Sequence, residues 1–407
     1  MSLTPVNIQP GSQIKQRIVV LDYLRVIAVV ILFFFHLGMI WVPEWTFHFK
    51  QSSQWYWLQN VLMLTSPWRM GLLWFIAGAS LYAMQQSKGL LYLITRRSNA
   101  VLLPLLVGIY AVVPVQLFVE MTQQQATNAS MLSFFWQFYF GDDNFFSEFS
   151  SGIWHHVDVN HLWFLRSLWR FTLLLVAFHW ILVFLRRRFG VFNIAWLIGF
   201  VSLSLCTMYI EDSDIKRDVY GFTCLLYGYW FGHSANFWQW LRKQRYRLLL
   251  LFVLLTVTYE IGFTLRGEFV DRALVYEGAM YAYYIAKVVG LLAILALAHR
   301  VFVKPSTIFE SANRYVFPFY VVHQSVLIGI GYYTSALFMT PFIAMVVTGL
   351  LSAVVCVGLL WLCKESVLFG GLLGKRAEET HWLHSTHAQM VIGILTLPLA
   401  LRLVGVI

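Results

Sequence analysis

The chain contains a succession of continuous apolar runs, each about twenty residues long, which is the length that a helix needs to cross the hydrocarbon core of a bilayer. The first of these runs covers residues 21–42, and a comparable one covers residues 342–362. A transmembrane β-strand would instead alternate apolar and polar residues over roughly ten positions, which these runs do not do. The runs therefore predict membrane-spanning helices.

The composition excludes the main water-soluble classes. Of the 407 residues, 59% are hydrophobic and only 12% are charged, whereas a soluble domain carries about 25% charged residues. A fold of this size could not remove so much apolar surface from water. The four cysteines fall inside apolar runs without the spacing of a metal or redox site, so we expect no metal centre. A soluble enzyme, a disordered chain and a disulfide scaffold are all excluded.

The predicted fold is all-α, a polytopic helical membrane protein with about 10–11 transmembrane helices around a buried active-site cavity. The predicted spans lie near residues 21–42, 68–84, 99–119, 162–184, 191–210, 219–239, 248–264, 274–298, 315–335, 342–362 and 389–406. We expect the aromatic segment 51–67 at the membrane interface and the amphipathic segment 364–376 on the membrane surface. The first run is too long for the core of a signal peptide, so we expect it to remain as a span.

Charge predicts the orientation of these spans. The chain has a net charge of +10, and its basic residues form short clusters on one set of loops, such as 186–188 and 242–247. Because loops rich in Lys and Arg stay in the cytoplasm, we predict a cytoplasmic N-terminus. Basic residues spread between apolar runs do not form one face of a soluble domain, so we expect the lipid bilayer, and no nucleic acid, as a partner.

These spans divide the chain into four predicted parts. Residues 1–20 are expected to form a cytoplasmic tail, and residues 21–370 the transmembrane domain. A cytoplasmic linker, 371–388, then precedes a candidate further transmembrane helix at 389–407. The pattern favours no particular oligomeric state.

Ionisable residues inside the predicted spans mark the candidate functional site, because a charge in the bilayer core is costly. The residues of this kind are Arg25, His36, Arg69, Arg166, Arg170, Lys287 and His323. Lys287 is expected to form a buried structural pair with Glu260. Arg166 and Arg170 share one face of their span one turn apart, and they are expected either to bind a ligand or to pair with the acids of a loop.

Arg25 and His36 share one face of the first span, since their separation of eleven positions is close to three helical turns. The rise between them is roughly 16 Å, so together they could hold a long ligand that enters from the cytoplasm. A guanidinium binds phosphate in a bidentate way, and an imidazole moves protons at neutral pH. The alternative is that Arg25 reaches the lipid headgroups and His36 hydrogen-bonds a neighbouring helix.

Four motifs in order resemble the integral membrane acyltransferases of acyltransferase family 3, over about residues 18–370. They are Arg25 with His36 after ten intervening residues, RMGLLWFIAGASL from Arg69, HLWFL from His161, and FYVVHQSVL with Tyr320 and His323. The HLWFL form and the late histidine are most similar to the branch that contains a bacterial glucan succinyltransferase. Two positions depart from the family pattern. Ala77 stands where Ser usually precedes Gly78, with Ser80 following, and Val101 stands where a further Arg is usual before Pro104.

The resemblance implies a transfer of an acetyl or succinyl group from cytoplasmic acyl-CoA to a hydroxyl of an extracytoplasmic glycan or lipid-linked sugar, in the cell inner membrane. It implies a site in which His36, Arg25 and His323 are catalytic and Arg69, Arg96 and Arg97 bind the donor. His161, Trp163, Arg166 and Tyr320 are candidates for contacting the acceptor or the oxyanion. Acyl-CoA is expected as a substrate, with no bound cofactor. His36 is expected to act as a base, with a transient acyl-imidazole as the alternative.

A secondary transporter that uses the buried His and Arg residues as a proton relay is the competing interpretation. Such transporters are commonly built from paired repeats with broken helices. The sequence shows no internal repeat of that kind, which favours the acyltransferase.

Overall fold

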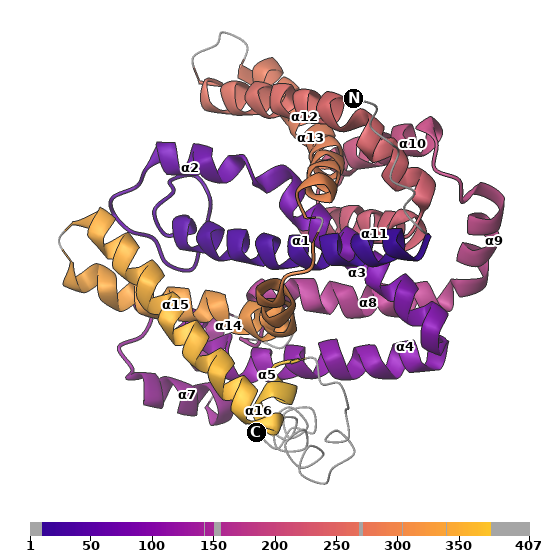
Figure 1. Cartoon of the computed structure of the whole chain (residues 1–407). Coiled ribbons are helices and arrows are strands. Elements are labelled where there is room, and N and C mark those ends of the chain that lie inside the picture. The colour runs from indigo at the N-terminus through magenta and orange to yellow at the C-terminus, as the bar shows by residue number, and fades with distance from the viewer. Residues whose placement is uncertain are drawn as a thin grey trace. The chain divides into compact units, whose positions relative to one another are not determined.

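The computed structural model describes residues 10–141, 143–149, 156–267, 272–302, 304–338 and 340–375. Every regular element in these ranges is a helix, and they contain no β-strand (Figure 1). Helices form here because a backbone in hydrocarbon must satisfy its own N–H and C=O groups. Six of these helices are long and apolar enough to cross a membrane, or seven if one bent pair is a single span. The chain is therefore a polytopic helical membrane protein, as predicted from its composition.

The chain divides into two compact units, each assembled from three stretches of sequence. The first unit comprises Met1–Ile31, Asn60–Leu90 and Leu175–Asn313, and the second comprises Leu32–Gln59, Leu91–Leu174 and Arg314–Ile407. Five helices pass from one unit into the other: α1 (Pro10–Met39), α2 (Tyr56–Met63), α4 (Leu90–Arg97), α8 (Trp163–Ala177) and α14 (Thr307–Leu337). Arg25 thus belongs to the first unit and His36 to the second, although one continuous helix carries both.

The first unit is held together by close helix packing. Its helices are α3 (Ser66–Lys88), α9 (His179–Phe189), α10 (Ile194–Cys206), η4 (Thr207–Tyr209), α11 (Ser213–Phe231), α12 (Ala235–Thr264) and α13 (Arg272–Val301). Helices α12 and α13 run alongside each other (Figure 1), and α3 packs on α11. At Gly78 a Cβ atom would lie 1.9 Å from the carbonyl oxygen of Leu225. Glycine is therefore required there, since a small residue lets two membrane helices approach backbone to backbone.

The second unit contains the shorter helices and the end of the described chain. Its elements are η1 (Ser98–Leu102), α5 (Leu103–Ala111), α6 (Pro114–Gln123), α7 (Met131–Phe140), η2 (Asp143–Phe149), η3 (Asn160–Leu162), α15 (Pro341–Glu365) and α16 (Val367–Leu372). Part of α14 completes it. The hydroxyls of Thr334 on α14 and Thr348 on α15 share a hydrogen bond of 2.6 Å. Such a bond joins two helices where the surrounding hydrocarbon offers no partner.

Two predicted spans are interrupted in the structure, whereas the run 99–119 lies within one apolar span, Ala100–Gln123. That span comprises η1, α5 and α6, with Pro104 and Pro114 in the first turns of the last two. The run 162–184 bends by 76° between its two helices, at Phe178. The run 219–239 joins the end of α11 to the start of α12, and Ser234 caps the new helix by accepting from the backbone N–H of Phe237. A single capping serine does not lower the hydropathy of a run enough to reveal the break.

The remaining segments agree with the prediction in part. The run 191–210 forms a shorter apolar helix, and the run 248–264 is the second half of the 30-residue α12. The aromatic segment 51–67 contains α2, and the segment 364–376 contains α16. The predicted last span, 389–406, lies outside the described residues, and the total of about 10–11 spans stays a prediction.

Candidate active site

Two of the predicted catalytic residues, His36 and His323, lie side by side in the second unit. Nδ1 of His36 is 2.9 Å from Nε2 of His323, although the residues are 287 positions apart in sequence. Their rings stack with centroids 5.0 Å apart and an interplanar angle of 23°. His36 comes from the last turn of α1 and His323 from the middle of α14, where it is completely buried. The structure therefore brings together two histidines that lie far apart in the sequence.

The hydrogen bonds of this pair assign its tautomers when both rings are neutral. Nδ1 of His323 is 2.7 Å from the carbonyl oxygen of Tyr320, and because a carbonyl only accepts, Nδ1 carries the proton. Nε2 of His323 must then accept, so Nδ1 of His36 is the donor between the two rings. The lone pair of His36 is left on Nε2. A positioned imidazole nitrogen in this state has the chemistry of a general base.

His161 and Tyr320 fasten the start of α8 to the segment of α14 that precedes His323. Nε2 of His161 donates to the carbonyl oxygen of Val321 over 2.9 Å, and the hydroxyl of Tyr320 donates to the carbonyl oxygen of His161. Nδ1 of His161 accepts from the amide of Gln116 over 2.8 Å. Both ring nitrogens of His161 are thus engaged within the protein. The geometry suits a residue that positions His323, while contact with acceptor or oxyanion stays a prediction for His161 and Tyr320.

Gln116 is a site residue that the sequence analysis missed. Its amide nitrogen donates to His161 and, over 2.6 Å, to the hydroxyl of Ser325, while its oxygen accepts from Gln324 over 3.3 Å. Gln116 is completely buried and Gln324 nearly so. Buried polar groups strengthen one another only when all are satisfied. The available signal was an uncharged amide inside each of two apolar runs, which a search for ionisable residues passes over.

The loop 40–55, between α1 and α2, folds back over the end of α1. Lys50 anchors it, because its ammonium group donates to the carbonyl oxygens of Met39, over 2.7 Å, and Val42. Partial burial lowers the pKa of Lys50 to about 8. The ring of Phe47 stacks on His36 with centroids 6.3 Å apart. The loop therefore supplies one wall beside the candidate base.

A second histidine in this loop, His48, pairs with Glu120 of α6. Its Nδ1 is 2.5 Å from Oε2 of Glu120, and both side chains are partly exposed. The sequence analysis missed this pair, because Glu120 follows the apolar run 99–119 and His48 follows the first run, so neither was counted as intramembrane.

In the first unit, oxygen atoms of Asp22, Ser80 and Asn313 hold Arg25. Its Nη1 donates to Asp22 and to Asn313, each over 3.0 Å, and its Nη2 donates to the hydroxyl of Ser80 over 2.9 Å. Ser80 is the serine that follows the altered Ala77–Gly78 position in the sequence. The guanidinium is therefore fixed in place on α1 and partly neutralised by Asp22. Its contact with a donor phosphate stays a prediction.

The other predicted site residues lie on several helices, α3, α4 and α8. Arg69 is buried on α3 and donates to the hydroxyl of Thr65 over 3.0 Å. Arg97 and Arg166 are partly buried in the second unit, as is Trp163, whose ring packs edge-on against Phe164. The side chain of Arg96 lies outside the described residues. The roles of these residues stay predictions.

The predicted pair of Lys287 with Glu260 is wrong. The ammonium group of Lys287 lies 3.6 Å from the ring centroid of Tyr220 and 4.6 Å from that of Tyr284. Within the described part of the chain no ion pair joins it to Glu260. Aromatic faces stabilise a cation by their quadrupole, and they replace the expected carboxylate here.

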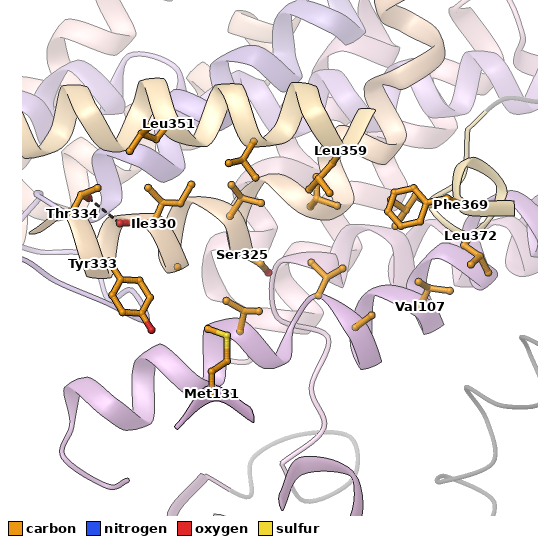
Figure 2. A pocket seen from close by; sticks show the side chains of 18 of the residues that line it. Val107, Met131, Ser325, Ile330, Tyr333, Thr334, Leu351, Leu359, Phe369 and Leu372 are labelled. Carbon is orange, nitrogen blue, oxygen red and sulfur yellow. Dashed lines mark hydrogen bonds between the residues drawn. The ribbon is translucent and has the colours of Figure 1, made fainter. Parts of the chain in front are cut away.

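A long apolar groove lies in the second unit beside the histidine network (Figure 2). It has a volume of about 720 Å³, and α5, α6, α7, α14, α15 and α16 line it. Ser325, which accepts from Gln116, is one of the few polar side chains on its wall. A lining made mostly of leucine, valine and other apolar groups suits a hydrocarbon chain better than a hydroxyl-rich ligand.

The fold and site define a class of protein, a polytopic helical membrane protein in which the end of the first helix contributes one histidine to a hydrogen-bonded pair. Residues 18–362 match the family model described as an acyltransferase domain, and the chain belongs to that family. It is therefore a membrane acyltransferase, which confirms the predicted family. No curated protein and no solved structure matches the chain. The match extends from α1 to α15 and so includes Arg25, His36 and His323.

Proposed function

We propose that this protein is an integral membrane O-acyltransferase that moves an acetyl or succinyl group from cytoplasmic acyl-CoA to a hydroxyl of an extracytoplasmic glycan or lipid-linked sugar. The observation that carries the proposal is the hydrogen-bonded pair of His36 and His323 within a chain of the acyltransferase family. We place the protein in the cell inner membrane with its N-terminus in the cytoplasm, on the distribution of basic loops. The motifs around His161 and His323 favour the branch of glucan succinyltransferases.

The proposed reaction begins with a hydroxyl of the acceptor beside Nε2 of His36. A sugar hydroxyl is a poor nucleophile, so Nε2 takes its proton as the oxygen attacks the thioester carbonyl. The tetrahedral intermediate collapses, the C–S bond breaks, and the thiolate of coenzyme A takes the proton from His36. An ester and a free thiol result, and His36 returns to its starting state.

His323 supports this step as a positioning residue. It accepts from Nδ1 of His36 and so keeps the lone pair on the nitrogen that meets the substrate. The same bond strengthens when His36 becomes an imidazolium, because a charged donor makes a stronger hydrogen bond. A carboxylate plays this part in serine hydrolases, and a neutral imidazole plays it here with less electrostatic gain.

We assign Arg25 to the donor, together with Arg69, Arg96 and Arg97. Arg25 precedes His36 by roughly 16 Å along α1, which carries both side chains. Its guanidinium is already oriented by Asn313 and Ser80, and a phosphate of coenzyme A would compete with the carboxylate of Asp22 for its charge. A planar guanidinium binds phosphate with two parallel hydrogen bonds.

The test uses the purified protein in lipid nanodiscs with radiolabelled acetyl-CoA or succinyl-CoA and a short glucose oligosaccharide. The proposal expects label in the oligosaccharide, released by mild base as an ester. Flux of substrate in proteoliposomes without dependence on acyl-CoA would favour the transporter instead. Label that stays on acid-quenched protein before it reaches the acceptor would replace direct transfer by an acyl-imidazole at His36.

A further inference from the structure

The pair of His48 and Glu120 is not used by the reaction described above. Nδ1 of His48 donates to Oε2 of Glu120 over 2.5 Å, and the side chains are 19% and 29% exposed. Among the described residues, no other group bonds to Nε2 of His48 or to Oε1 of Glu120. A ligand can therefore reach an imidazole nitrogen and a carboxylate oxygen that are held side by side.

The pair is built rather than accidental, since two further contacts join the loop to α6. The side-chain amide of Gln123, one turn after Glu120, donates to the backbone carbonyl of Lys50 over 2.8 Å and accepts from its backbone N–H over 3.1 Å. Lys50 in turn fastens the loop to the carbonyl oxygens at the end of α1. His48 is thus presented to Glu120 by a loop that is fixed on both sides.

Phe47 connects this pair to the candidate base. Its ring stacks on His36 at 6.3 Å between centroids and lies 5.7 Å from the ring of His48. Phe47 therefore contacts both His36 and His48. A ring-shaped ligand bound to His48 and Glu120 would rest against Phe47, with another of its hydroxyls directed to His36.

The charge of the His48–Glu120 pair decides which of the two substrates, donor or acceptor, it suits. A coenzyme carries several phosphates, and the carboxylate of Glu120 would repel them. Sugar hydroxyls, by contrast, both donate and accept, so they match a carboxylate and an imidazole at once. The apolar groove beside Ser325 offers no such partners to a sugar. The pair thus suits the acceptor and not the donor.

We infer that His48, Glu120 and Phe47 form the acceptor subsite, which binds a sugar by its hydroxyls and presents one of them to His36. This inference rests on the proposed function and names the class of substrate that its site takes. A free carbohydrate and a lipid-anchored one carry the same hydroxyls, so the experiment compares both forms.

The test measures acceptor and donor kinetics of Glu120→Gln and His48→Gln in nanodiscs, because sugar detergents would occupy the subsite. Each variant should raise the KM for the glucose oligosaccharide about ten- to a hundredfold, the cost of a hydrogen bond to a charged group. The KM for acyl-CoA should stay within twofold. Glu44→Gln is the matched control, since Glu44 lies in the same loop but pairs with Gln59, and it should leave both values unchanged. A lipid-anchored form of the oligosaccharide should show the same ratio.

Direct binding of the oligosaccharide, without donor, separates this inference from the proposed function. Binding that Glu120→Gln weakens, with no acyl transfer by the wild-type protein, would support the subsite and contradict the reaction. Transfer with an acceptor KM that is unchanged in Glu120→Gln and His48→Gln would overturn the subsite and keep the reaction. A wild-type protein that neither binds nor acylates either form of the oligosaccharide would overturn the assignment of a sugar. Size-exclusion profiles identify any variant that does not fold.

Discussion

The carbonyl oxygen of Tyr320 accepts a hydrogen bond from Nδ1 of His323, one helical turn further along α14. This single bond determines which nitrogen of His323 can accept and therefore which nitrogen of His36 keeps its lone pair. The reactivity that we assign to α1 thus depends on backbone geometry in α14, far away in the sequence.

Replacement of His323 should show how much its hydrogen bond to His36 contributes to the rate of acyl transfer. His323→Phe removes the acceptor for Nδ1 of His36 and should lower kcat about 10- to 100-fold, as loss of an orienting partner commonly does. His323→Gln keeps an accepting oxygen and should retain more activity than His323→Phe. Steady-state kinetics with saturating donor and acceptor measure the difference. Equal rates for the wild-type protein and His323→Phe would show that the pair has no part in catalysis.

Loss of Gln116 should destabilise the second unit. Gln116→Leu leaves His161, Ser325 and Gln324 without their partner, which costs about 1–3 kcal/mol for each buried group left unsatisfied. Thermal unfolding of the variant in nanodiscs should therefore begin at a lower temperature. Gln54→Leu, in an exposed position, is the control and should unfold like the wild-type protein. An unchanged melting temperature for Gln116→Leu would refute the network.

Two glycines should respond differently to alanine, because Gly78 lies in the contact of α3 with α11 and Gly278 lies in open space on α13. Gly78→Ala places a Cβ atom 1.9 Å from the carbonyl oxygen of Leu225, so the helices must separate and the melting temperature should fall by several degrees. Gly278→Ala meets no atom within 4 Å and replaces glycine inside α13, so it should not destabilise the protein. Similar melting temperatures for the two variants would show that α3 and α11 are not in backbone contact.

Because of Lys50, the free energy of unfolding should depend on pH in the alkaline range. Burial lowers its pKa in the folded state to about 8 from 10.5, so between these values the unfolded chain binds more protons. Stability from this group therefore rises as the pH increases from about 8 to about 10.5. A neutral amine keeps two N–H donors, enough for Met39 and Val42. Thermal unfolding at both ends of this range measures the effect, and Lys50→Met should reduce the rise. An identical pH dependence in the variant would contradict it.

The fold class could be predicted because apolar runs and the bilayer thickness leave few alternatives. The breaks inside the runs could not, because they depend on local backbone chemistry. Between α11 and α12, for example, Ser234 caps a new helix inside the run 219–239. The bend at Phe178 is marked in the sequence by a single histidine, His179, which does not end the apolar run. Breaks of this kind are set by packing between helices, which a single apolar pattern does not record.

The sequence predicts both histidines of the pair as site residues, but it does not predict the hydrogen bond between them. His36 and His323 are visible as costly residues inside apolar runs, whereas their hydrogen bond requires the packing of α1 on α14 within the second unit. Lys287 shows the opposite case, since a buried cation predicts a carboxylate and the structure supplies tyrosine rings. Gln116 and His48 were missed because one is uncharged and the other lies outside the spans.

Acyl transfer by a variant of His36 tests the central claim most directly. His36→Ala and His36→Gln are compared with the wild-type protein and with His179→Ala, whose histidine pairs with Gln85 in the first unit. We predict that both His36 variants bind acyl-CoA like the wild-type protein but transfer label to the acceptor at least 100-fold more slowly, while His179→Ala is fully active. Transfer by His36→Ala at the wild-type rate would contradict the account.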